Sequence, residues 1–135
     1  MTFTTATQEL LALVSSILTL AEADNVVFDN EAYDPVPRQA WTKVSIVHKA
    51  GIQETLGHVG ARRFEYKGLV AVRSYAPVDF GTSPSAGLFE FFIPYAHVRI
   101  LDSLRFETPR ISEGVREGAW HVSGIEMPFV YENIL

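Results

Sequence analysis

The stretch from Trp41 to Gly81 decides the fold, because it holds two strand patterns separated by an irregular segment. The first is Trp41-Thr-Lys-Val-Ser-Ile-Val47, and the second is Gly68-Leu-Val-Ala-Val-Arg-Ser-Tyr-Ala-Pro77. In the first pattern apolar and polar side chains alternate, which is typical of a strand with one face in the core. We expect the two strands to pair as a long antiparallel hairpin, with the second strand beginning near Ala61.

An amphipathic helix is predicted before this hairpin, from about Ala6 to Ala23. Thr5 and Gln8 have the spacing of a capping box, in which the Thr hydroxyl and the Gln side chain bond to free amides at the helix start. Apolar residues then recur at intervals of three and four, so they form one stripe that a sheet must cover. The stripe consists of Leu10, Leu13, Val14, Ile17, Leu18 and Ala21.

After the hairpin, Ser83 and Pro84 suit the start of a second, short helix, which Pro94 should end or kink. The Phe-rich segment over 88–101 also fits a strand. Residues 104–111 alternate and predict a strand, Glu117 and Gly118 predict a turn, and residues 119–131 predict a long final strand. Gly124 and Pro128 within that last strand indicate a bulge or a sheet edge.

Length and composition are those of one domain spanning residues 1–135. The chain has 47% hydrophobic residues, no cysteine and a net charge of -5. An acidic chain without cysteine gives no sign of disulfides, of thiolate chemistry or of general affinity for nucleic-acid phosphates. The apolar run at residues 10–21 lacks a cationic flank and is short and interrupted by Ser and Thr, so we expect a soluble, unexported protein without membrane contact.

Residues that could carry catalysis are scattered along the sequence. The four histidines, His48, His58, His97 and His121, lie in different segments without HExxH spacing, and the glycines match neither a P-loop nor a dinucleotide-binding fingerprint. Helix capping explains Ser83 better than a nucleophile elbow does. We therefore expect no enzymatic activity and no cofactor.

Two surface features remain, one acidic and one basic. Asp29, Glu31 and Asp34 lie in a Pro-containing segment that lacks the spacing of an EF-hand. Arg62, Arg63, Lys67 and Arg73 alternate with Phe64, Tyr66 and Tyr75. The basic group suits a subunit interface or a solvated strand face, and nucleic-acid stacking is a weaker reading because Glu65 interrupts it.

The order of these features resembles the tail terminator proteins of long-tailed bacteriophages over nearly the whole chain. The resemblance rests on the N-terminal helix, residues 28–35 and 41–46, Leu56-Gly-His58, Arg63, residues 68–72, Pro77, Phe80-Gly81, Gly118-Ala-Trp120 and residues 128–131. The chain departs from the family pattern at the second helix, where a Phe-rich segment broken at Pro94 replaces a longer one.

This resemblance implies an α+β subunit with an antiparallel or mixed sheet, a long central hairpin, and both helices packed on one face. It further implies a homo-hexameric ring in the virion, assembled in the host cytoplasm, at the neck end of the tail. The ring would cap the tail tube, stop addition of the tail tube protein and join the head–tail connector or stopper protein. DNA would pass through the lumen without specific binding, since six copies at -5 give a ring of about -30.

In such a ring, the irregular segment from His48 to Gly60 and the basic strand are the candidates for contact with a neighbouring subunit or the tube. The interface candidates are Ile52, Glu54, Leu56, His58, Arg62, Arg63 and Arg73, and the candidates for the lumen or connector face are Asp29, Glu31 and Asp34. Two alternatives stay open. One is another head–tail connector or stopper protein, and the other is a small α+β ligand-binding domain whose pocket is lined by Phe89, Phe91, Phe92, Tyr95 and Trp120.

Overall fold

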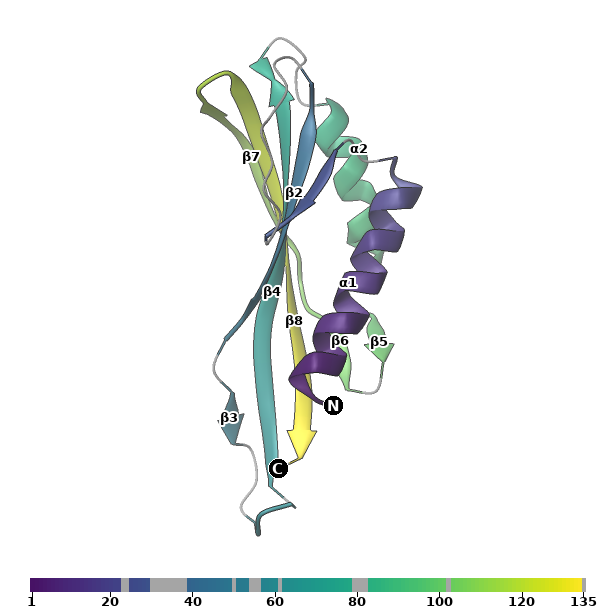
Figure 1. The fold of residues 1–135 in the computed structure, drawn as a ribbon, viewed down its shortest axis with the longest axis vertical. Coiled ribbons are helices and arrows are strands. Elements are labelled where there is room, and N and C mark those ends of the chain that lie inside the picture. The colour runs from purple at the N-terminus through teal and green to yellow at the C-terminus, as the bar shows by residue number, and fades with distance from the viewer. Residues whose placement is uncertain are drawn as a thin grey trace.

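The computed structural model describes residues 1–22, 25–29, 39–49, 51–53, 57–60, 62–78, 83–101 and 103–134. A large mixed sheet forms one layer, and both helices lie on the same side of it (Figure 1). The α+β fold with a central hairpin is confirmed. The elements are α1 Phe3–Leu20, β1 Val26–Phe28, β2 Trp41–His48, β3 Ile52–Gln53, β4 Arg63–Pro77, α2 Ser83–Phe92, the 3-10 helix η2 Ile93–Tyr95, β5 Arg99–Leu101, β6 Leu104–Phe106, β7 Arg110–Glu117 and β8 Trp120–Ile134.

The central hairpin is antiparallel, as predicted. β2 pairs with β4 antiparallel from Trp41 opposite Tyr75 to His48 opposite Gly68. β4 is fifteen residues long and pairs along its whole length with β8, so these two strands form the spine of the sheet. Among the described strands the order is β1-β2-β4-β8-β6-β5, with β3 beside β4 and β7 beside β8. The pairing of β1 with β2 is parallel, which makes the sheet mixed.

The core lies between the helices and one face of the sheet. Alternation places Val70 and Val72 of β4 toward the helices, and Met127 and Phe129 of β8 follow the same rule. Each fully buried side chain of this size contributes about 1.5–3 kcal/mol. The predicted stripe of α1 is confirmed, because Leu10, Val14, Ile17 and Leu18 are buried and Leu13 and Ala21 pack against the cluster.

The start of α1 differs from the prediction. Thr2, not Thr5, is the N-cap, and its hydroxyl accepts a hydrogen bond from the Thr5 amide at 3.2 Å. The helix therefore begins three residues earlier and ends at Leu20. The amphipathic pattern fixed the buried side of the helix, whereas several Thr residues could all serve as a cap.

Length and hydropathy by themselves leave α1 within the range of a membrane span. Its 18 residues have a mean hydropathy of 1.3, which core helices of soluble proteins and signal sequences also reach. The prediction that this apolar segment is too short to span a membrane is therefore wrong as far as length is concerned. In this structure its buried stripe packs against the sheet.

The C-terminal half corrects two predictions. The strand predicted over 104–111 is two strands, β6 and β7, because Pro109 lacks an amide and the chain leaves the ladder before Arg110. β8 is an interior strand, so the edge prediction is wrong: Pro128 lies between the parts of β8 that pair with β6 and with β7. The bulge occurs in β7 instead, near Gly114 at φ 43°.

The ambiguous segment 88–101 contains three kinds of structure. α2 ends at Phe92, a 3-10 turn runs from Ile93 to Tyr95, and β5 begins at Arg99. Pro94 lies in the 3-10 turn, which agrees with the prediction that it ends the α-helix. The turn at Gly118 is also confirmed, with a φ of 61°.

Candidate assembly surface

We call the sheet face opposite α1 and α2 the open face, because among the described residues no helix covers it (Figure 1). Every second residue of β2 and β4 points there, from Trp41 to Val47 and from Arg63 to Pro77. Val47 remains 45% exposed. An antiparallel sheet commonly has one solvated face, and in this chain that face carries much of the predicted basic and aromatic strand.

In the structure, the residues of the predicted basic cluster contact different partners. Arg63 forms an ion pair with Glu132 at 3.5 Å, and Lys67 forms one with Glu65 at 3.5 Å. Because these side chains are substantially exposed, each pair is worth at most about 1 kcal/mol. Arg62 instead lies over the ring of Phe64, with 5.8 Å from its guanidinium carbon to the ring centroid.

Arg73 lies opposite a second positively charged residue. It lies directly opposite Lys43 in the β2–β4 ladder, and both side chains project from the open face. No ion pair or side-chain hydrogen bond links either of them to another described residue. Sequence reasoning missed Lys43, because its position opposite Arg73 depends on the strand register that the structure supplies.

Three aromatic side chains adjoin this cationic pair. Trp41 stacks on Tyr75 with ring centroids 4.0 Å apart and planes 8° apart, and Trp120 meets Trp41 edge-on at 6.4 Å. We call Trp41, Tyr75 and Trp120 the aromatic cluster. Stacked and edge-on arrangements are the favourable geometries for such rings, so the cluster is a preformed apolar area on the open face.

The predicted aromatic pocket is not formed. Phe89 and Phe92 are buried in the core beneath the helices, Phe91 is 43% exposed, and Trp120 belongs to the aromatic cluster on the other face. Helical spacing separates Phe91 from its buried neighbours, and strand alternation turns Trp120 away from them.

The segment after β2 presents apolar side chains to solvent. Ile52 is 65% exposed although β3 pairs with β4, and Val59 is 85% exposed. His58 is also exposed. Glu54 and Leu56 lie outside the described residues.

Of the predicted acidic residues, Asp29 can be placed. It is exposed directly after β1 and accepts a hydrogen bond from the Ser45 hydroxyl at 2.6 Å. Glu31 and Asp34 lie outside the described residues.

His48 is the histidine with the most enclosed surroundings. Its Nε2 is 2.9 Å from the Thr7 hydroxyl, its Nδ1 is buried without a hydrogen-bond partner, and its ring contacts Phe3, Phe129 and Tyr131. Burial lowers the pKa of His48 below its usual 6.5. Within the described ranges no three His, Asp or Glu side chains are grouped to hold a metal ion.

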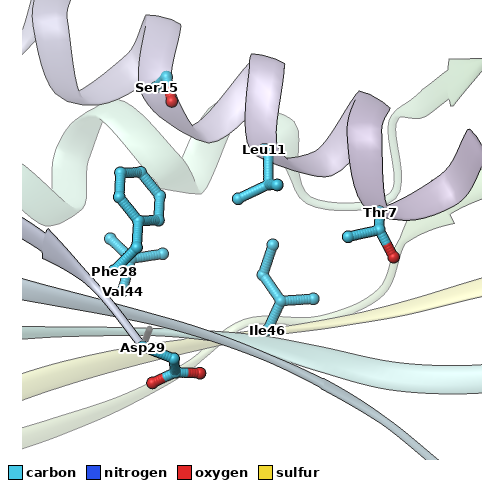
Figure 2. A pocket seen from close by; sticks show the side chains of 7 residues that line it. All are labelled: Thr7, Leu11, Ser15, Phe28, Asp29, Val44 and Ile46. Carbon is cyan, nitrogen blue, oxygen red and sulfur yellow. The ribbon is translucent and has the colours of Figure 1, made fainter. Parts of the chain in front are cut away.

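A groove of about 540 Å³ runs between α1 and the β1–β2 edge. Figure 2 shows Leu11 reaching from the helix toward Ile46, with Phe28 beside Val44 and the Asp29 carboxylate directed away from the helix. The groove is thus mainly apolar, with Thr7 and Ser15 as hydroxyl groups along the helix.

No family model and no curated protein matches this chain. Among solved structures 21 chains match, and one of them, a protein without a functional name, has a TM-score of 0.65 at 15% sequence identity. That similarity covers 93% of this chain and 94% of the other. At this level of identity the likeness concerns the α+β fold over nearly the whole chain.

Proposed function

We propose that this chain is a structural subunit that assembles into a hexameric ring on the end of a phage tail tube. The ring ends tube polymerisation and offers the surface that joins the tail to the head connector. The observation that carries the proposal is the open face, where the aromatic cluster adjoins two cations of the basic strand. Aromatic and Arg side chains are enriched at protein interfaces, and the three rings of the aromatic cluster are half-buried in the subunit.

Two further features support an assembly role. Ile52 and Val59 project from the end of the β3–β4 region, which extends beyond the helices in Figure 1. An exposed apolar extension of this kind gains free energy when a partner covers it. The sequence resemblance to tail terminators supplies the identity of the partners: a second copy, the tail tube protein and the connector.

Native mass spectrometry and negative-stain microscopy test this function. The purified protein is measured by itself and after addition of tail tubes from the phage that encodes it. A hexamer, or a monomer that closes into rings at tube ends, supports the proposal. A monomer that leaves tube length and tube ends unchanged would overturn it.

The groove beside α1 supports a second candidate, a ligand-binding domain for small apolar molecules. Its volume and its lining by Leu11, Phe28 and Ile46 suit such a ligand. Thermal shift measurements with a panel of fatty acids and aromatic compounds separate the two functions. Saturable stabilisation together with indifference to tail tubes would favour the ligand-binding domain.

A further inference from the structure

The strand β7 has one side of its backbone without a partner among the described strands. It is eight residues long and pairs with β8 alone. The other strands at the margins of the sheet, β1, β3 and β5, are two or three residues long. A long edge strand offers a row of N–H and C=O groups to a strand from another chain. β7 is therefore the place where the sheet of this subunit can be extended from outside.

The side chains of β7 are also uncovered, and Figure 1 shows the strand apart from both helices. Every β7 residue whose side chain is described is exposed, with Ile111 at 47% and Val115 at 62%. Ile111 lies opposite the buried Ile125, on the side of the helices, whereas Val115 lies opposite Val122, on the open face. A strand added beside β7 would thus cover apolar surface on both faces of the sheet.

The hydrogen bonds of β8 show which β7 residues point their backbone groups outward. The Glu107 amide donates to the carbonyl oxygen of Pro128 at 2.8 Å, so even-numbered residues of β8 direct their backbone groups away from β4 and towards β6 and β7. Odd-numbered residues of β8 bond to β4. Ile111 and Arg116 lie opposite odd-numbered residues, and their own N–H and C=O groups therefore point to the unpaired side.

A bulge sets the order of the side chains along β7. It lies between Ser112 and Val115, with Gly114 at φ 43°. The bulge shifts the alternation by one residue, so Arg110 and Ser112 before it share the open face with Val115 and Glu117 after it. Bulges and charged side chains deter pairing of an edge with an arbitrary strand. A strand that pairs with β7 must match this interrupted and charged pattern.

A second β7 matches it. When two copies of β7 run antiparallel with their bulges side by side, Arg110 of each copy lies opposite Glu117 of the other, on the open face. Opposite charges in this position stabilise a strand pair. Ile111 then lies opposite Arg116, which also points its backbone outward, so each such pair can exchange a hydrogen bond in both directions. This register uses the full length of the strand.

The charges concerned have no ion pair within the described part of the subunit. Glu126 lies opposite Arg110 in the β7–β8 ladder, and Arg73 borders the same shallow hollow of about 240 Å³ as Glu117, yet no ion pair joins these groups among the described residues. In the two-copy sheet, Arg110 lies between Glu126 of its own subunit and Glu117 of the other. The contact therefore adds a carboxylate beside this cation.

We propose that two copies of this chain pair through β7 in an antiparallel, two-fold symmetric contact that joins their sheets edge to edge. A contact of this kind uses the same surface on both copies, so it closes with two subunits and does not propagate. It is therefore distinct from the repeated contact of the proposed ring, and it concerns the protein away from tail tubes.

Charge reversal tests the register of this contact. Arg110→Glu and Glu117→Arg each oppose like charges across the contact, and each should raise the dissociation constant of the dimer, measured by analytical ultracentrifugation, by at least about tenfold. The two variants mixed in equal amounts should form a heterodimer, because both charge pairs are then restored. A chain with both substitutions should dimerise like the wild type. Glu90→Arg and Arg105→Glu are the controls, since both residues are exposed on other elements, α2 and β6.

A disulfide tests the same register in a chain that has no cysteine. Ser112 of one copy and Val115 of the other form a non-hydrogen-bonded pair in the proposed sheet, with Cα atoms about 4.5 Å apart, which a disulfide can bridge. A mixture of Ser112→Cys and Val115→Cys should give a linked dimer under mild oxidation. Each variant by itself, and Ser112→Cys mixed with Ser16→Cys on the exposed side of α1, should give no more than random collision does.

The outcomes separate this inference from the proposed function. Wild-type protein that stays monomeric at its highest soluble concentration would overturn the β7 contact and leave the ring at tube ends untouched. Self-association that neither charge reversal weakens, with no disulfide in the mixture, would show that copies join elsewhere. A dimer that responds as expected but forms no ring at tube ends would support the contact and overturn the proposed function.

The folding of each variant is checked by circular dichroism. Arg110 also faces Glu126 of its own subunit, so Arg110→Glu is the substitution that puts folding most at risk. If that variant unfolds, Glu117→Arg and the cysteine mixture still decide between the β7 contact and its absence.

Discussion

The ring of Phe129 lies over Gly68, its partner in the β4–β8 ladder, and fills the position where a Cβ on Gly68 would stand. The carbonyl oxygen of Val47 also approaches this position. Glycine is therefore required here by space, and the same close approach brings the Phe129 ring against His48, with ring centroids 5.4 Å apart. The contact joins the central hairpin to the final strand.

Replacing Gly68 by Ala should lower the free energy of unfolding by about 1–3 kcal/mol, because the added methyl group displaces an aromatic ring and a backbone carbonyl. Urea unfolding followed by circular dichroism measures the change. Gly124→Ala is the matched control, since a Cβ there would meet its nearest atom, the Val72 carbonyl oxygen, at an ordinary 3.6 Å. Equal effects of the two substitutions would contradict this account.

The stability of the fold should decrease as the pH falls from about 7 to 5. Burial lowers the pKa of His48 in the folded protein, so the unfolded chain binds a proton more readily than the folded chain does. The contribution of His48 is complete above the unfolded pKa of about 6.5 and is lost as the pH falls toward the folded pKa. Unfolding midpoints across this pH range should fall less steeply for His48→Gln; an identical slope would show that His48 does not contribute.

Leu10 is fully buried in the stripe of α1 that packs on the sheet. Leu10→Ala should lower the free energy of unfolding by about 2–5 kcal/mol, because it removes buried methyl groups and leaves a cavity. Leu20→Ala, at a position 69% exposed, should change it by less than about 0.5 kcal/mol. Chemical denaturation measures the free energy of unfolding of both variants. A similar decrease in the two would mean that α1 does not pack as described.

Relief of the Lys43–Arg73 repulsion should stabilise the isolated subunit. Lys43→Thr replaces one of two directly opposed like charges with a residue favoured in strands, so the free energy of unfolding should rise by about 0.2–1 kcal/mol at low salt. The gain should shrink at high salt, because added ions screen the repulsion. A loss of stability in low salt would indicate that the two cations are compensated within the subunit.

The sequence predicted the local structure where its pattern was periodic. The alternation at Trp41 to Val47 gave the correct strand, and the spacing of Leu10, Val14 and Ile17 gave the correct buried side of α1. The predicted N-cap at Thr5 was wrong, because any of several Thr residues could start the helix. The single strand predicted over residues 104–111 was also wrong, because a strand can leave its ladder while the sequence keeps its alternation. Pro128 was predicted to mark a bulge or a sheet edge, whereas strand pairing places it in an interior strand.

For the candidate surface, the sequence determined which residues could matter: a strand rich in Arg and aromatic side chains, and an N-terminal region with acidic residues and no basic ones. The tertiary structure decided how they are combined. Register set Lys43 against Arg73 and Trp41 against Tyr75, and it brought Arg63 of β4 beside Glu132 of β8. These relationships depend on contacts between residues distant in the chain, and such contacts are fixed only when the strands pair and the helices cover one face of the sheet.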